Sequence, residues 1–313
     1  MAKKKKRRGE FEVIGAIRGR HVPSRRVVIG IGDDCAALDV RGDELCLITI
    51  DMLLDGTHFL LGEATPEEIG WKSIACSLSD VAAMGCEPTA AVVSVGFTKK
   101  IDDDFIDRFH NGITDICRRY GVDLVGGDIT SGKGRLAISV AVLGRDAGLA
   151  PVTRAGAQPG DAILVTGSLG GSALGKHLRF HPRVSEGIYL NRSADLHAMI
   201  DISDGLAADL NHIAEESGVG AALDAEAIPI SKDARKLARK SGKPPLEHAL
   251  GDGEDYELLF TVPVHDVERL IADQPLAVPL TRIGEITTGK GLVLRRKDGS
   301  VEPLAPRGWE HLK

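Results

Sequence analysis

The stretch AMIDISDGLAADLNH, residues 198–212, contains both kinds of secondary structure from which this chain is built. Its apolar start is typical of a buried strand, and Leu206 and Leu210 then recur at helical spacing. A strand that leads directly into a helix is expected in α/β and α+β proteins. The junction also carries two aspartates, Asp201 and Asp204, which raises the question of what chemistry they serve.

Strand and helix patterns alternate along the rest of the chain. Runs rich in Val, Ile and Leu predict strands in the first half, at residues 27–38, 45–54, 89–97 and 136–144. Apolar residues at three- and four-residue spacing predict helices there, at about 66–84 and 103–120. In the second half we expect strands at 162–167, 256–263, 281–286 and 291–296, and helices at 205–217, 231–241 and 264–273. The predicted fold class is therefore mixed α/β (α+β).

Length and composition suggest two domains and an acidic surface. The chain has 313 residues, 43% of them hydrophobic, and we place a domain boundary near residue 150, giving domains at 9–149 and 150–313. Residues 1–8 form a basic tail that we expect to be disordered. Six of the 39 Lys and Arg residues lie in this tail, so the other 33 face 45 Asp and Glu residues. An acidic body argues against nucleic acid as a partner.

Cysteine usage and hydropathy exclude further classes of protein. The five cysteines are odd in number and form no C-x-x-C pair, which argues against a disulfide framework and a zinc site and predicts buried, reduced thiols. No run approaches the roughly 18 apolar residues of a membrane span. No apolar signal segment follows the basic tail. We therefore expect a cytoplasmic protein with no membrane partner.

Aspartates recur in short motifs near the ends or bends of the predicted strands. The motifs are GIGDDCAAL with Asp33 and Asp34, CLITID with Asp51, VGGDITSG with Asp128, and the opening stretch. Thr49 and Asp51 are two residues apart, so they face the same side of a strand. Asp80 shares a polar helical stripe with Cys76 and Ser77. These oxygen-bearing side chains are candidates for one cluster.

Each aspartate alone also has a structural interpretation, because Asp is a common turn residue and helix N-cap, as Asp204 would be before Gly205. Together they indicate a cation, since clustered carboxylates repel one another unless a cation neutralises them. Hard oxygen ligands suit Mg²⁺, which in turn suggests a polyphosphate substrate. The common phosphate-binding motifs are missing, and the glycine-rich segment 166–175 is only a weak candidate for a phosphate-binding loop.

Six motifs, in this order and spacing, resemble the thiamine-monophosphate kinase family. They are GIGDDCAAL, TIDMLLDGTHF, WKSIACSLSDVAAMG, VGGDIT, AMIDISDGLAADL and GDGEDYELLF. The family shares a superfamily with aminoimidazole ribonucleotide synthetase, selenophosphate synthetase and a hydrogenase maturation factor. The resemblance implies phosphorylation of thiamine monophosphate to thiamine diphosphate with ATP and several Mg²⁺ ions, the last step of thiamine diphosphate biosynthesis. It also implies a homodimer whose N-terminal sheets form a shared barrel near the ATP, and a C-terminal α/β domain that closes the site.

The same resemblance implies roles for individual residues. The implied metal ligands are Asp34, Thr49, Asp51, Asp80, Asp128, Asp201 and Asp204. The implied ATP contacts are Gly127, Asp128, Arg154 and Ser203, and the implied thiamine-monophosphate contacts are His58, Glu254 and Trp309. No catalytic nucleophile is implied, so we expect direct, metal-assisted phosphoryl transfer.

Two other functions stay open at this point, while a third alternative, a purely structural scaffold, would not explain so many aligned aspartates. A sister enzyme of the superfamily is one, although two of these depend on a cysteine near the N-terminus or at the extreme C-terminus. Here the first cysteine is Cys35 and the chain ends in HLK. A non-catalytic thiamine-phosphate-binding protein is the other, but it would be expected to lack some metal ligands, and all of them are present.

Overall fold

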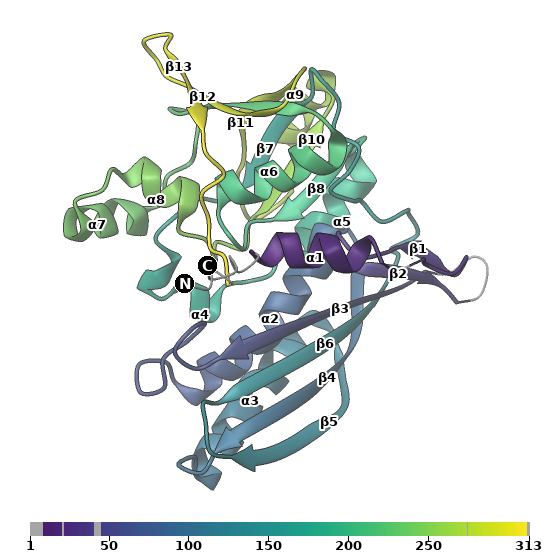
Figure 1. Cartoon of the computed structure of the whole chain (residues 1–313), viewed down its shortest axis with the longest axis vertical. Helices are drawn as coiled ribbons and strands as arrows, with labels where there is room; N and C mark the ends of the chain where they lie inside the picture. Colours follow the sequence, from purple (N-terminus) through teal and green to yellow (C-terminus); the bar gives the residue numbers. More distant parts are fainter. Residues whose placement is uncertain (1–8, 21, 41–44, 274, 312–313) are drawn as a thin grey trace, which may run out of the picture.

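A computed structural model of the chain describes residues 9–20, 22–40, 45–273 and 275–311. The chain forms two halves, each built on one sheet, with the sheet of the first half in the lower part of Figure 1 and the sheet of the second half in the upper part. The tail at 1–8, which we predict to be disordered, lies outside the described residues. Among the helices described, none is both long and apolar enough to cross a membrane.

The first half carries a six-stranded sheet of order β1-β2-β3-β6-β4-β5. Its strands are β1 (Val27–Ile29), β2 (Ala36–Asp39), β3 (Leu45–Leu54), β4 (Glu87–Thr98), β5 (Asp123–Gly132) and β6 (Ala137–Arg145). Two helices, α2 (Pro66–Ala83) and α3 (Asp103–Tyr120), cover one face of this sheet (Figure 1). The opposite face exposes apolar side chains of β3, including Ile50 and Met52.

The second half carries a seven-stranded sheet of order β13-β12-β9-β11-β7-β10-β8. Its strands are β7 (Ala162–Thr166), β8 (Ala198–Asp201), β9 (Gly220–Asp224), β10 (Leu258–Val262), β11 (Leu280–Thr287), β12 (Gly291–Arg295) and β13 (Val301–Leu304). Its helices are η1 (Ser172–Leu174), α4 (Lys176–Arg179), α5 (Val184–Ser193), α6 (Leu206–Ser217), α7 (Lys232–Ser241), α8 (Pro245–Gly251) and α9 (Val264–Asp273). The first helix of the chain, α1 (Glu10–Arg18), packs on this half, where the Phe11 ring lies 4.4 Å from that of His212.

Helix α2 joins the two halves. It contacts β3 and β6 on one side and α4, α5 and β8 on the other, and fourteen of its 18 residues are buried. Thr65 caps its first turn by accepting the amide of Glu68, and Pro66 occupies the first helical position. Because α2 is buried on all sides, its polar side chains must find partners inside the protein.

The structure confirms the mixed α/β class and most predicted elements, with two corrections and several elements that were not predicted. The single strand predicted at 27–38 is wrong: β1 and β2 are separated by a bend, where Gly32 has a φ of 121° that favours glycine. The elements that were not predicted include α1, α5, α8, β5, β9 and β13; in β5, glycines obscure the strand character. The interpretation of Asp204 as an N-cap is also wrong, since Gly205 precedes the first turn of α6. All five cysteines are free, and only Cys46 is partly exposed.

Candidate active site

A cavity of about 340 Å³ lies between the two halves, beside α2. Its walls come from β3 and the loop after it, from α2, and from the second half together with the C-terminal segment. Eight of the predicted site residues line it: Asp51, His58, Asp80, Asp201, Ser203, Asp204, Glu254 and Trp309. The cavity therefore brings together residues from distant parts of the sequence.

Three carboxylates meet at one end of this cavity. Asp34 at the bend before β2, Asp80 on α2 and Asp201 at the end of β8 each offer an oxygen within 4.8 Å of the others. Hydroxyl groups hold the cluster, since Thr49 donates to Asp80 at 2.5 Å and Ser79 donates to Asp201 at 2.5 Å. Both halves of the chain thus contribute to a single acidic cluster.

Asp51 lies beside this cluster. It faces α2 from β3, as the spacing to Thr49 predicts, and accepts a hydrogen bond from Ser77 at 2.5 Å. Although both it and Asp128 were expected near strand ends, each lies inside its strand. For Asp51 this places the carboxylate over the middle of α2 and against the cavity.

Ionisation of these carboxylates is unfavourable, because they are buried and their negative charges repel one another. Burial and then the neighbouring carboxylates raise the pKa of Asp80 well above its usual value, and burial with Asp34 raises the pKa of Asp201 to about 7. Burial also raises the pKa of Asp51. A cation bound here would remove both the repulsion and the cost of burial. The potential metal ligands are carboxylate and hydroxyl oxygens, which fit Mg²⁺ better than a softer metal.

Arg154 is the cation that contacts the cluster in the structure. Its guanidinium donates to Asp34 at 2.6 and 3.2 Å, and its backbone amide donates to Asp33 at 3.3 Å. This pairing raises the pKa of Arg154, while burial and the adjacent Asp34 raise the pKa of Asp33 to about 7. The predicted contact of Arg154 with ATP stays a prediction. The pairing with Asp34 uses Nε and Nη2, so the guanidinium keeps the N–H groups of Nη1 as further donors.

Asp204 belongs to a second group of potential ligands. Its carboxylate lies within 4.8 Å of a carboxylate oxygen of Asp209 and a ring nitrogen of His212. Asp209 accepts the backbone amides of Asp204 and Gly205, at 3.1 and 3.0 Å, and so satisfies donors at the start of α6. Asp204 is therefore free of the capping role, and burial raises its pKa to about 6.

Asp128 and Gly127 lie apart from the cavity. In the sheet register Asp128 pairs with Ser94, which pairs with Ser139, which pairs with Met52. Three interstrand steps separate Asp128 from β3, a distance of about 14 Å. Paired residues share a face, so Asp128 lies on the same outer face as Met52, opposite to Asp51. A Cβ at Gly127 would come within 1.9 Å of a carbonyl oxygen of β4, so close packing alone requires glycine there.

The other end of the cavity holds His58, Glu254 and Trp309. His58 accepts the Leu54 amide on Nδ1 at 3.0 Å, which leaves the ring proton on Nε2. Burial, followed by the nearby His311, lowers the pKa of His58 to about 4, so the ring is neutral at pH 7. Trp309 is 53% exposed, and its backbone amide donates to the carbonyl of Asp204.

Sequence reasoning missed Lys72 as a residue of this end. Its ammonium is fully buried and donates to the carbonyl of His58 and to the carboxylate of Glu254. A usable signal existed, because Lys72, Cys76 and Asp80 are four residues apart and share one helical face. The periodicity that indicated Asp80 therefore also applied to Lys72.

Two other features do not join the site. In the glycine-rich segment 166–175, the amide of Gly170 and the hydroxyl of Ser172 both donate to Asp255, so the structure gives no support to a phosphate-binding loop.

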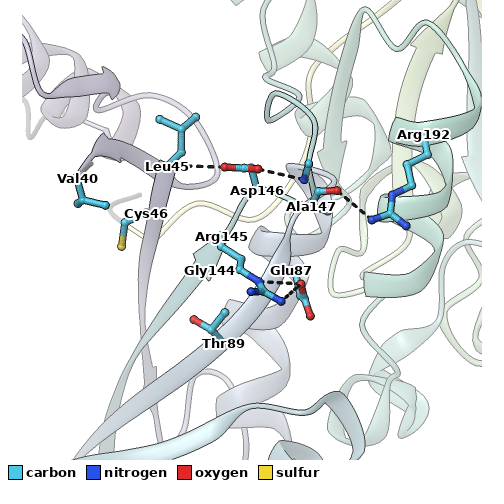
Figure 2. A pocket seen from close by; sticks show the side chains of 11 residues that line it. Val40, Leu45, Cys46, Glu87, Thr89, Gly144, Arg145, Asp146, Ala147 and Arg192 are labelled. Carbon is cyan, nitrogen blue, oxygen red and sulfur yellow. Dashed lines mark hydrogen bonds and ion pairs between the residues drawn. The ribbon is translucent and has the colours of Figure 1, made fainter. Parts of the chain in front are cut away.

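A larger cavity, about 580 Å³, lies at the far ends of β3, β4 and β6 (Figure 2). Its charged groups bond to one another or to the backbone: Arg145 pairs with Glu87, and Arg192 donates to the carbonyl of Ala147.

Comparison with known families agrees with this architecture. A model described as AIR synthase related protein, N-terminal domain, matches residues 32–145, and one described as AIR synthase related protein, C-terminal domain, matches residues 158–297. The thiamine-monophosphate kinase of Rhodopirellula baltica is 38% identical over 96% of this chain and 97% of its own length. The chain belongs to the thiamine-monophosphate kinase family.

Other members of the thiamine-monophosphate kinase family are similarly close. The Escherichia coli K12 enzyme is 35% identical over 97% of this chain and 98% of its own. The solved structure "AaThiL complexed with AMPPCP and TMP" is 34% identical, with a TM-score of 0.83 and coverage of 97% of both chains. A hydrogenase maturation protein HypE in complex with ATP is 22% identical with a TM-score of 0.71, which shows a shared fold only.

Proposed function

We propose that this protein is an enzyme that transfers the γ-phosphoryl group of ATP to thiamine monophosphate, forming thiamine diphosphate. The observation that supports it most is the shared cavity. Its acidic end, with Asp80 and Asp201, suits metal-bound phosphates, and its other end, with His58, Glu254 and Trp309, suits a thiamine ring system. The AaThiL structure was solved with AMPPCP, an ATP analogue, and TMP, and it covers 97% of this chain.

Magnesium is part of the proposal. Asp34, Thr49, Asp51, Asp80, Asp201 and Asp204 are the residues of this cavity region that would hold it. When bound, Mg²⁺ neutralises phosphate charge and helps to align the phosphates of donor and acceptor. The protein itself positions the carboxylates with Ser77, Ser79 and Thr49. The acceptor is a phosphate whose second pKa is near 6, so it is largely ionised at pH 7 and needs no strong general base.

The thiamine end recognises a cationic, aromatic acceptor. Glu254 supplies a carboxylate to the cavity, and the half-exposed indole of Trp309 offers a face for a thiazolium or pyrimidine ring. A cation–π contact of this kind contributes about 0.5 to 2 kcal/mol. The neutral His58 ring has its Nε2 proton available as a donor, which suits a phosphate or hydroxyl oxygen.

A homodimer completes the proposal and accounts for Asp128. The outer face of the first sheet exposes Ile50 at 70% and Met52 at 61%, together with Val92 and Leu143 of the neighbouring strands. Contiguous apolar surface of this kind favours association with a second copy, as in the barrel that the resemblance implies. Asp128 lies on this face, so we infer that it acts with Gly127 at the ATP site of the partner copy.

The test is formation of thiamine diphosphate from thiamine monophosphate, ATP and Mg²⁺. Samples with free thiamine as the acceptor, and samples with EDTA, serve as controls. We expect product only when thiamine monophosphate is the acceptor and only when Mg²⁺ is present. A folded protein that binds ATP but forms no thiamine diphosphate would refute the proposed function and favour a sister activity or a binding role.

A further inference from the structure

Lys72 combines complete burial with a charge. It is 0% exposed, and its ammonium donates to the carbonyl of His58 at 2.7 Å and to a carboxylate oxygen of Glu254. A buried ammonium is costly unless it is well paired, and an apolar side chain of similar volume would often pack as well. The presence of the charge in the middle of α2 therefore calls for an explanation beyond packing.

Glu254, the partner of Lys72, has an unusual backbone conformation with a positive φ. Among the described residues, it and Tyr256 are the two that have a positive φ without being glycine, at 55° and 50°. Backbone hydrogen bonds hold this segment, from the Glu254 amide to Ser203 at 2.7 Å and from the Tyr256 amide to Ile202 at 2.8 Å. Such conformations persist where the surroundings over-determine them, which is common at binding sites.

The Lys72 ammonium connects two walls of the cavity. His58 lies in the loop after β3, in the first half, and Glu254 precedes β10, in the second half. One carboxylate oxygen of Glu254 accepts from Lys72, and 32% of the side chain remains exposed at the cavity. The Lys72 ammonium donates to these two residues and not to Asp34, Asp80 or Asp201.

We infer that Lys72 is a positioning residue that fixes the thiamine end of the cavity, by holding Glu254 of one half against the His58 segment of the other. This inference rests on the proposed function. Without the ammonium, Glu254 has no ion-pair partner among the residues that the structure describes, and it is free to turn away from the position in which it meets a cationic ring. Binding of thiamine monophosphate should then weaken, while the acidic end and ATP binding stay intact.

The experiment compares steady-state kinetics of Lys72→Met, Glu254→Gln and the double variant with the natural protein. Lys72→Met should raise the KM for thiamine monophosphate about tenfold or more, with the KM for ATP changed by less than about twofold. The double variant should be no worse than the more impaired single variant, because Lys72 acts through Glu254. If Lys72→Met does not fold, Lys72→Gln, which keeps a hydrogen-bond donor, takes its place.

Arg192→Met is a matched control. Arg192 also donates to a backbone carbonyl across the two halves, that of Ala147, but it lies at the other cavity (Figure 2). Its KM values should equal those of the natural protein. Equal changes in both KM values, no change in either, or additive effects in the double variant would overturn the inference while leaving the kinase assignment intact. Absence of kinase activity in the natural protein would instead refute the proposed function, and this inference with it.

Discussion

Asp201→Asn should stabilise the metal-free protein and at the same time abolish turnover. Asp201 is 2% exposed, with an oxygen within 4.8 Å of oxygens of Asp34 and Asp80. At an effective dielectric constant of about 20, two unit charges at that distance repel by about 3 kcal/mol. Raising the pKa of Asp201 from 3.8 to about 7 destabilises the metal-free folded state by on the order of 4 kcal/mol above pH 7. The substitution also weakens the hydrogen bond from Ser79, which costs about 1 kcal/mol. The free energy of unfolding of the metal-free variant should therefore rise by about 2 to 3 kcal/mol.

The assay is thermal unfolding in EDTA and in millimolar Mg²⁺, followed by the kinase measurement. In EDTA the variant should melt about 5 °C higher than the natural protein, and Mg²⁺ should stabilise it much less. Its turnover should fall at least about a hundredfold. Asp161→Asn is the control: this buried aspartate accepts from the Gln158 amide and His197, so the variant should lose about 1 to 3 kcal/mol in both conditions. An Asp201→Asn protein that melts lower in EDTA, or turns over normally, would refute the reasoning.

Three further predictions follow from the same geometry. In EDTA, stability should rise as the pH falls from about 8 to 6, because the folded state, with the pKa of Asp201 raised to about 7, binds more protons there than the unfolded state; a flat melting profile would contradict this. Ile50→Lys should dissociate the proposed dimer in size-exclusion chromatography and lower turnover at least about tenfold; a fully active dimer would argue against the proposed barrel. Arg154→Met should raise the KM for ATP and not that for thiamine monophosphate; the reverse would remove Arg154 from the ATP site.

Local patterns in the sequence were sufficient for much of the fold. Helices α2 and α3 follow from apolar residues at three- and four-residue spacing, because this signal lies within each segment itself. The shared orientation of Thr49 and Asp51 follows from strand alternation alone. For the same reason, the aspartates could be recognised as a group before their positions in space were known.

Contacts between distant segments were beyond such patterns. Ser79 and Asp201 are 122 residues apart in the sequence, and Lys72 and Glu254 are 182 apart. Periodicity describes which face of an element is apolar, but it does not say which element covers that face. The position of Asp128 could not be predicted for a related reason. The face on which it lies depends on β5, and the glycines of β5 prevented its recognition as a strand.

Helix α2 explains how both ends of the cavity keep a fixed separation. Asp80 and Ser79 serve the acidic end, and Lys72 serves the thiamine end, eight residues earlier. Eight residues of α-helix span about 12 Å, and a buried helix of this kind does not change its length. The indole of Trp71 further ties α2 to the second half by donating to the Phe180 carbonyl at 2.8 Å. In the proposed function, the distance between the donor and acceptor sites therefore depends on one rigid element.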